Sequence, residues 1–339
     1  MRLSAPFKKL FPFLRRPSDT GFNTAAGIDI EQNAVKAVLL SGSRLEHICV
    51  EHYLIVPLAE DAVKGDKIQD YEQLVTYLQQ IRPTLGACRR IAAALPDSLT
   101  ATEELHCPPD TSVAEIETLI ESGLLPSAAA ESVRYDYHIS AAPEAQHIVA
   151  VSAKQDDIEL RAELFEQAGL ALSVLDTDLL AQHHAFLFWL NLHAPELLAE
   201  KTVFVGIYST QTYVLIVQHG RILYRQETQS GAAMPSENDI SETFNIQTAY
   251  TIQRALQFYA STQDTEPPSA IRHIFLTGSA TQNPDLAATV SRICGISAQT
   301  LHPVAHAKFG STLNSAQLQH DAPELTIAFG LALRGLHHD

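Results

Sequence analysis

The feature that most constrains this fold is a strand–turn–strand pattern that occurs twice. In residues 27–40, two apolar runs flank a short polar turn, Glu31–Asn33, as in a tight β-hairpin. A near-copy occupies residues 205–216, about 177 residues later, and each copy leads into a second turn and a third strand. A repeat of this kind predicts two related halves, each built on an antiparallel meander.

The two copies differ in their polar residues. Asp29 lies near the end of the first strand and Lys36 lies in the second strand, facing it across the turn. An acid and a lysine in this arrangement could hold a phosphate and its magnesium ion. The second copy has Gly206 where the first has Asp29. The halves therefore differ at the position where such chemistry would occur.

Composition places limits on the class of protein. The chain has 339 residues, of which 46% are hydrophobic and 18% charged, which is typical of a folded protein with two domains. Its net charge of −16 argues against nucleic acid as a partner. No apolar run approaches the ~20 residues that cross a bilayer, and no signal-peptide pattern is present. Four scattered cysteines suit a reducing compartment: Cys49, Cys88, Cys107 and Cys294. We expect a cytoplasmic protein.

Residues 1–22 form a basic segment that departs from the acidic composition of the rest. Five lysines and arginines precede the first acidic residue and alternate with apolar side chains. This pattern fits weak contact with an anionic membrane surface or a partner, but three prolines interrupt any helix and favour a flexible tail.

Hydrophobic periodicity predicts alternating strands and helices. Beyond the meanders, we expect strands at 91–95, 100–105, 134–139, 147–152, 172–175 and 271–277, and helices at 68–82, 113–122, 155–168, 178–192, 239–261, 284–293 and 325–336. Pro83 and Gly86 are expected to end the first helix. Residues 229–240 are expected to be a loop and residues 264–269 a linker.

Other candidate sites are weaker. The strand–turn–helix around Gly278 and Ser279 fits either an adenosine site or an ordinary turn. His47 and Cys49 would share a strand face and His52 would not, so a zinc site lacks convergent ligands. The histidine pairs at 183–184 and 337–338 fit packed or exposed residues better than ligands. No motif for a covalent nucleophile or a Walker loop is present.

Taken in order, these motifs resemble the actin-like ATPase superfamily, and within it the PilM family of type IV pilus assembly proteins, which is related to the cell-division protein FtsA. The family pattern Gly-Ile-Asp-Ile-Gly-Ser-Ser-x-Val-Lys is matched by residues 27–36 except at its glycine and serine positions. Further stretches similar to the family lie at 93–96, 167–170, 252–259 and 322–334. The resemblance extends from about residue 24 to about residue 335.

The resemblance implies an α/β, actin-like (RNase H-like) two-domain fold with an FtsA/PilM-type inserted subdomain and a nucleotide between the domains. It divides the chain into a basic tail (1–22), the first part of domain I (23–96), the inserted subdomain (97–172), the second part of domain I (173–200), domain II (201–324) and a C-terminal helix returning to domain I (325–339).

The resemblance also implies a function. It predicts a cytoplasmic scaffold of the type IV pilus or DNA-uptake pilus, at the cytoplasmic face of the inner membrane, which binds the N-terminal cytoplasmic tail of the inner-membrane protein PilN. That tail carries an apolar segment, so an apolar cleft with a polar rim would suit it. Other pilus platform proteins and self-association are further possible contacts, and competence and twitching motility are the processes involved.

ATP and magnesium are the cofactors that the resemblance implies, at Asp29, Glu31, Lys36, Gly206, Gly278 and Ser279. This sequence departs from the family at several of these positions. Glu31 replaces a glycine near the phosphates, Gly206 replaces an acid, and Gly278 alone remains of a glycine triplet. The segment before the helix at 252–259 is also short. We therefore predict a degenerate site that binds nucleotide weakly or not at all.

Two other functions stay open. An active ATPase, or a sugar-kinase-like phosphotransferase on the same fold, would need a second acid in place of Gly206. A filament-forming protein like FtsA would need a C-terminal amphipathic membrane helix, for which residues 335–339 are too short.

Overall fold

Contacts divide the chain into two units, which are described separately. Unit 1 comprises residues 1–42, 52–181 and 331–339, and unit 2 comprises residues 43–51 and 182–330. The computed structural model describes residues 24–42, 44–124, 132–141, 145–208, 211–229, 240–262, 271–305 and 307–336. Outside these ranges lie the basic tail of residues 1–22, residues 230–239 of the expected loop, the linker of residues 264–269 and the pair at 337–338.

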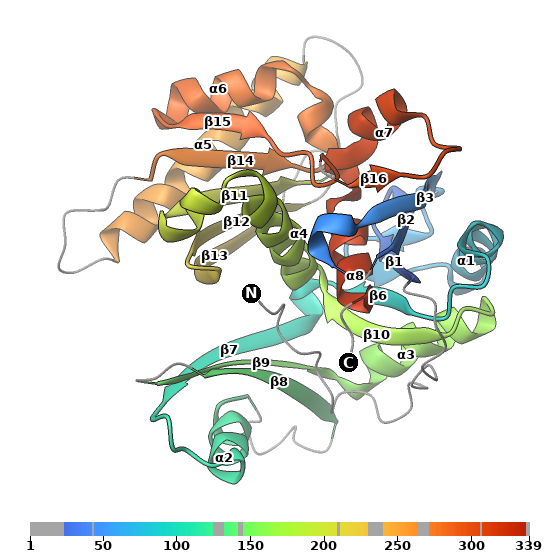
Figure 1. Ribbon diagram of the computed structural model, residues 1–339, viewed down its shortest axis with the longest axis horizontal. Helices are drawn as coiled ribbons and strands as arrows, with labels where there is room; N and C mark the ends of the chain where they lie inside the picture. Colours follow the sequence, from blue (N-terminus) through green and yellow to red (C-terminus); the bar gives the residue numbers. More distant parts are fainter. Residues whose placement is uncertain are drawn as a thin grey trace. The chain divides into compact units, whose positions relative to one another are not determined.

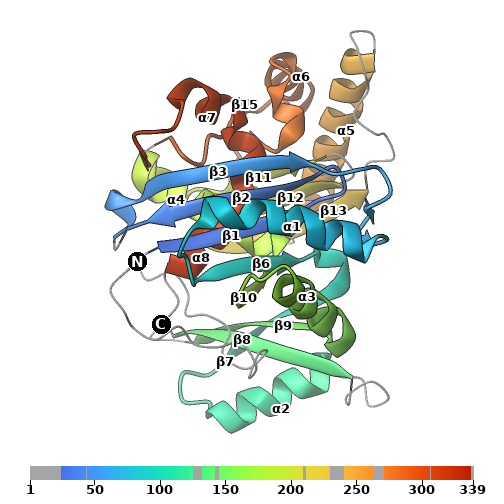
Figure 2. The same cartoon turned by 90° about the vertical axis from the view of Figure 1, so that its right-hand side faces the viewer.

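Unit 1 is built on the first copy of the repeat. Its main strands are β1 (Thr24–Ile30), β2 (Ala34–Ser41), β3 (Cys49–Pro57), β6 (Ile91–Leu95) and β10 (Leu172–Thr177). Their order is β10-β6-β1-β2-β3, with β1 antiparallel to β2 and parallel to β6. Helices α1 (Tyr71–Leu85) and α3 (Gln155–Gln167) pack on this sheet (Figure 2). Strands β1, β2, β6 and β10 are buried along most of their length, so their sequences read as nearly continuous apolar runs.

Helix α1 follows the predicted periodicity but continues further than expected. Its N-terminus is capped by Asp70, whose carboxylate accepts a hydrogen bond from the N–H of Gln73 at 2.9 Å. The prediction that Pro83 ends the helix is wrong, because Pro83 lies inside α1, which continues to Leu85. A proline in the last turn removes only one helical hydrogen bond, and the buried side chain of Leu85 favours the extra residues.

A separate small sheet lies between β6 and β10 in the chain. Its elements are β7 (Thr100–Cys107), α2 (Val113–Leu124), β8 (Val133–Ala141) and β9 (Gln146–Lys154) (Figure 1). The strand order is β7-β9-β8, and both pairings are antiparallel. Helix α2 packs on one face of this sheet through Ile116 and Ile120, which contact Ile148 and Ala150 in a small core of their own.

Unit 2 repeats the meander and its parallel extension. Its strands are β11 (Thr202–Ile207), β12 (Gln211–Gln218), β13 (Arg221–Gln229), β14 (His273–Thr277) and β15 (Ser297–Thr300), in the order β13-β12-β11-β14-β15. Helices α5 (Ile240–Ser261) and α6 (Asp285–Cys294) pack on one face. On the other face, Phe186 of α4 (Asp178–His193) contacts Phe204 and Phe275 at centroid distances of 4.9 and 5.4 Å.

The two meanders share one register. Asp29 lies opposite Lys36 in the β1–β2 pair, and Gly206 lies opposite Tyr213 in the β11–β12 pair. Both positions are offset by the same interval of about 177 residues. The repeat predicted from the sequence is therefore also a repeat in the structure, and Gly206 occupies the position in unit 2 that Asp29 occupies in unit 1.

The last helix, α8 (Thr326–Leu336), follows β16 (Lys308–Phe309) and α7 (Ser315–Asp321). Within unit 1, the Nε of Arg334 donates to Oδ2 of Asp176 on β10 at 2.8 Å, and both side chains are buried. Gly335 permits a close approach, because a Cβ there would lie 2.8 Å from the Cβ of Ala25 on β1. The end of α8 is thus fixed to the sheet of unit 1.

Candidate functional site

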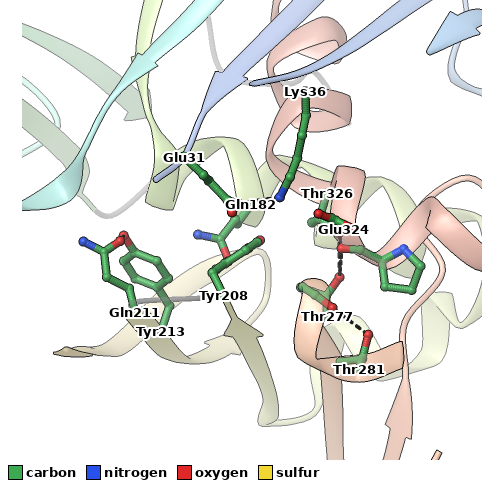
Figure 3. A network of polar contacts seen from close by, with 12 residues as sticks. Glu31, Lys36, Gln182, Tyr208, Gln211, Tyr213, Thr277, Thr281, Glu324 and Thr326 are labelled. Atoms are coloured by element: carbon green, nitrogen blue, oxygen red, sulfur yellow. Dashed lines mark hydrogen bonds and ion pairs between the residues drawn. The ribbon is translucent and has the colours of Figure 1, made fainter. Parts of the chain in front are cut away.

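The first hairpin of unit 1 holds a buried lysine whose charge is already compensated. Lys36 has no exposed surface, and its Nζ lies 2.7 Å from Oε1 of Glu31 (Figure 3). The sequence predicts that Glu31 repels a phosphate, and in the structure its carboxylate also forms an ion pair with Lys36. An incoming anion would have to displace Glu31 before this lysine could bind it.

Asp29 lies on the same hairpin and is only 4% exposed. Its Oδ2 atom is buried without a hydrogen-bond partner. Burial, followed by the charge of Glu31, raises the pKa of Asp29 to about 8, against the opposing charges of Lys36 and Arg161. At pH 7 the carboxyl group is therefore mostly neutral. A neutral acid is a poor ligand for magnesium, which prefers a carboxylate.

Arg161 of α3 is a charged neighbour that sequence reasoning misses. Its side chain is buried, and burial lowers its pKa to about 10 while the charges of Asp29 and Asp178 oppose that change. Arg161 shares the buried face of α3 with Ile158 and Phe165. An arginine is rarely buried without a charged neighbour. The position of Arg161 in the apolar stripe of α3 is therefore the signal in the sequence that could have identified it.

The turn of the first hairpin is occupied by contacts within unit 1. The backbone N–H of Glu31 donates to the carbonyl of Ala34 at 3.0 Å. The side-chain oxygen of Gln32 accepts from the N–H of Gly65 at 2.9 Å, and the carbonyl of Asn33 accepts from Leu58 at 2.8 Å. Phosphate-binding turns present backbone N–H groups to the ligand. Here the N–H of Glu31 already has a partner.

In unit 2, the space beside Gly206 is filled. A Cβ at this position would lie 2.1 Å from Oε1 of Gln182 and 2.8 Å from a ring carbon of Tyr208. The hydroxyl of Tyr208 donates to the same Oε1 atom at 3.1 Å, and both side chains are buried (Figure 3). An aspartate at position 206 would require these buried groups to move. The absence of the acid is therefore accompanied by new packing in its place.

Gln182 and Tyr208 are site residues that sequence reasoning misses. Tyr208 occupies the position in the second hairpin that Glu31 occupies in the first. Gln182 is fully buried in α4, a helix that is otherwise mostly apolar at its centre, and its Nε2 has no hydrogen-bond partner. A buried amide within a largely apolar helix is a recognisable signal, but its partner Tyr208 lies 26 residues away in the turn between β11 and β12.

The turn at Gly278 has a structural reason for its glycine. Gly278 has φ +96° and ψ 171°, a conformation that is essentially restricted to glycine. A Cβ there would lie 2.2 Å from the carbonyl oxygen of Ile207. Its N–H and the hydroxyl of Thr277 both donate to the carbonyl of Pro323, each at 2.9 Å. The neighbouring Ser279 is half-buried at the start of a short 3₁₀ helix, Ser279–Gln282.

Potential metal ligands are dispersed over the described residues. Within the part of the chain that the structure describes, no three His, Cys, Asp or Glu residues are arranged to hold a metal ion. The expectation that His47 and Cys49 share a strand face is wrong, because His47 belongs to a 3₁₀ helix that ends before β3 begins. As for membranes, no helix among the described residues is long and apolar enough to cross one.

The geometry at Gly278 predicts a large loss of stability on substitution. Gly278→Ala should lower the free energy of unfolding by more than about 3 kcal/mol, because the new methyl group meets the backbone of Ile207. Gly295→Ala is the matched control, since Gly295 also has a positive φ, of +67°, but a Cβ there would meet no atom within 4 Å. The control should cost about 1 kcal/mol in chemical denaturation. Equal losses would contradict the backbone contact.

The pKa of Asp29 predicts a specific pH dependence. A raised pKa means that the folded state keeps a proton which the unfolded chain releases near its ordinary value of 3.8, so stability falls as pH rises from about 4 to about 8. Asp29→Asn should remove this contribution, which amounts to about 1.4 kcal/mol per pH unit within the window. The exposed Asp61→Asn variant should keep the dependence of the unmodified protein. If the free energy of unfolding changes with pH in the same way in Asp29→Asn and in the unmodified protein, the pKa of Asp29 is not raised in the folded state.

Comparison with known proteins identifies relatives. The family described as "Type IV pilus assembly protein PilM" matches residues 27–248 and 234–336. A chain of a PilM-PilN type IV pilus biogenesis complex is 18% identical, with a TM-score of 0.71, over 92% of this chain and 98% of that one. The ethanolamine utilization protein EutJ from Carboxydothermus hydrogenoformans is 13% identical, with a TM-score of 0.51, over 96% and 93% of the two chains.

The structural similarities concern the fold, since both identities are low. They confirm the predicted α/β, actin-like two-domain fold with an inserted subdomain. The match to the family extends over most of the sequence, from the first hairpin to the end of α8. This chain therefore belongs to the family of the type IV pilus assembly protein PilM.

Proposed function

We propose that this chain is a scaffold of the type IV pilus assembly platform, at the cytoplasmic face of the inner membrane, and that it binds the N-terminal tail of PilN. Membership of the PilM family supports a role in pilus assembly. Similarity to a chain of a PilM-PilN complex supports PilN as the partner. The proposed division is domain I (23–96 and 173–200), the inserted subdomain (97–172), domain II (201–324) and the C-terminal helix (325–339).

The scaffold works, in this proposal, without hydrolysing ATP. The observation that carries this part is the packing of Gln182 and Tyr208 beside Gly206, where the family has an acid that orders magnesium or the attacking water. Removal of such an acid alone can cost several kcal/mol of transition-state stabilisation. The ion pair of Glu31 with Lys36 adds a second obstacle, because it sets a carboxylate where a phosphate would approach.

An active ATPase is the alternative. The observation in its favour is that Asp29 and Lys36 lie opposite each other on β1 and β2, as a phosphate-binding pair would require. For this function, magnesium would have to lower the pKa of Asp29, and a phosphate would have to displace Glu31 from Lys36. Both changes cost free energy that binding would have to supply.

A titration with Mg-ATP separates the two functions. The scaffold predicts no heat of binding by calorimetry up to about 1 mM nucleotide, and no magnesium-dependent phosphate release. The Asp29→Ala variant is the control and should give the same trace. Binding in the micromolar range that is abolished by Asp29→Ala would overturn the degenerate site, while leaving the pilus scaffold untouched.

A peptide that copies the N-terminal cytoplasmic tail of PilN tests the scaffold itself. The full chain should bind it with a Kd of tens of micromolar or tighter, measured by fluorescence anisotropy. A scrambled peptide of the same composition controls for non-specific apolar contact. If the native peptide binds no better than the scrambled one at about 100 μM, the proposed partner is wrong.

A further inference from the structure

A strip of exposed aromatic side chains and an arginine lies on α5 and β13 of unit 2. Two of the six large apolar side chains that are exposed among the described residues belong to it: Tyr250 and Phe258, which are 50% and 59% exposed. With Tyr224 and Arg254, these residues are called the α5–β13 strip. Surface apolar residues are normal when scattered, whereas a contiguous group indicates a contact surface.

The strip is contiguous. Tyr250, Arg254 and Phe258 are spaced four residues apart on α5, so they form one row along the helix. At the end of this row, the ring of Phe258 lies 6.1 Å from the ring of Tyr224 on β13. Figure 2 shows α5 close to β13 within unit 2, in agreement with the contacts between the two elements.

The charges around the strip are mostly positive. Arg254 is exposed between the two aromatic residues of α5, and Arg221 is exposed on β13, whereas Arg225 directly follows Tyr224 and faces the other side of the sheet. The Nζ of Lys201 lies 5.8 Å from the centroid of the Tyr259 ring. Glu242, in the first turn of α5, is an exposed acid in the same four-residue spacing as Tyr250, Arg254 and Phe258. This is a local excess of positive charge on a chain whose net charge is −16.

We propose that the α5–β13 strip binds an acidic segment of another protein. Aromatic residues and arginine are enriched at interfaces and dominate their binding energy. Apolar side chains of the partner would pack on Phe258 and Tyr250, and a carboxylate between them would pair with Arg254, whose fork of N–H groups suits a carboxylate. The surrounding arginines would favour encounter with an acidic segment.

A second copy of this chain fits the strip less well as the occupant. A symmetric pair would place the arginines of both strips against each other, and like charges at an interface oppose association. An acidic segment of a different protein removes this repulsion. The strip lies on elements other than the two hairpins, so its test requires neither nucleotide nor the PilN tail.

The experiment is a selection from a random library of displayed peptides of about 12 residues, which covers an interface of this size. The library is selected on the immobilised full chain, after depletion on the Phe258→Ser variant. We expect the recovered peptides to be enriched in Asp and Glu together with aromatic residues or leucine. Synthetic copies should bind at least about tenfold more weakly to Phe258→Ser and to Arg254→Glu.

Leu160→Ser is the matched control, because Leu160 is also a large apolar residue, 42% exposed, but lies on α3. It should leave peptide binding unchanged, and thermal denaturation should show that all three variants stay folded. Recovery of basic peptides, or of none that distinguishes Phe258→Ser from the unmodified chain, would overturn the proposal. Sedimentation velocity gives a second way to overturn it. If the unmodified chain self-associates and the Phe258→Ser variant is monomeric, the occupant of the strip is a second copy of this chain.

Discussion

A charged lysine without exposed surface needs an anion beside it, and this requirement shapes the first hairpin. Lys36 lies in a strand that is buried along most of its length, so water cannot compensate its charge. The anion could come from a bound phosphate or from the chain itself. Here it comes from Glu31, at 2.7 Å. The charge of Lys36 is therefore compensated without a ligand, because the same side chain that repels a phosphate pairs with the lysine.

In the second hairpin, the buried polar side chains are joined by neutral hydrogen bonds in place of an ion pair. Position 206 carries no side chain, and the space is filled by a hydrogen-bonded amide and phenol from Gln182 and Tyr208. The opposing residue is Tyr213 in place of a lysine, and its hydroxyl donates to Oε1 of Gln211 at 2.6 Å. The two halves thus keep the same backbone register while using an ion pair in one and neutral hydrogen bonds in the other.

The sequence predicts the elements whose residues act locally. Strand β6 and helix α2 lie close to their predicted bounds, because an apolar run or a helical stripe is visible within a few residues. Strand β15 and helix α7 are not predicted, because Ser297–Thr300 and Ser315–Asp321 carry no such pattern and their strand or helix depends on neighbours. The predicted end of α1 is wrong since the burial of Leu85 is not visible beside Pro83.

The residues of the candidate site likewise fall into those that a local pattern predicts and those that depend on distant segments of the chain. The hairpin pattern alone places Asp29 and Lys36 opposite each other. Gln182 and Arg161 come from helices far from the hairpins in the sequence, and a single chain gives no sign of which distant side chains meet. An adenosine site is one interpretation of the glycine at 278, yet the carbonyl of Ile207 and that of Pro323 already account for its conformation. A retained glycine is therefore weak support for a ligand when the backbone itself requires it.

The packing at Gly206 also limits which single substitutions the second hairpin can accept during evolution without losing stability. Gly206→Asp alone brings a side chain into atoms of Gln182, which has no exposed surface, so the first step towards an acid lowers stability. Smaller residues at 182 and 208 without the acid would instead leave a cavity in the core of unit 2. The changes are tolerated only together. The neutral arrangement therefore persists as a local optimum, separated from an acidic hairpin by less stable single-step intermediates.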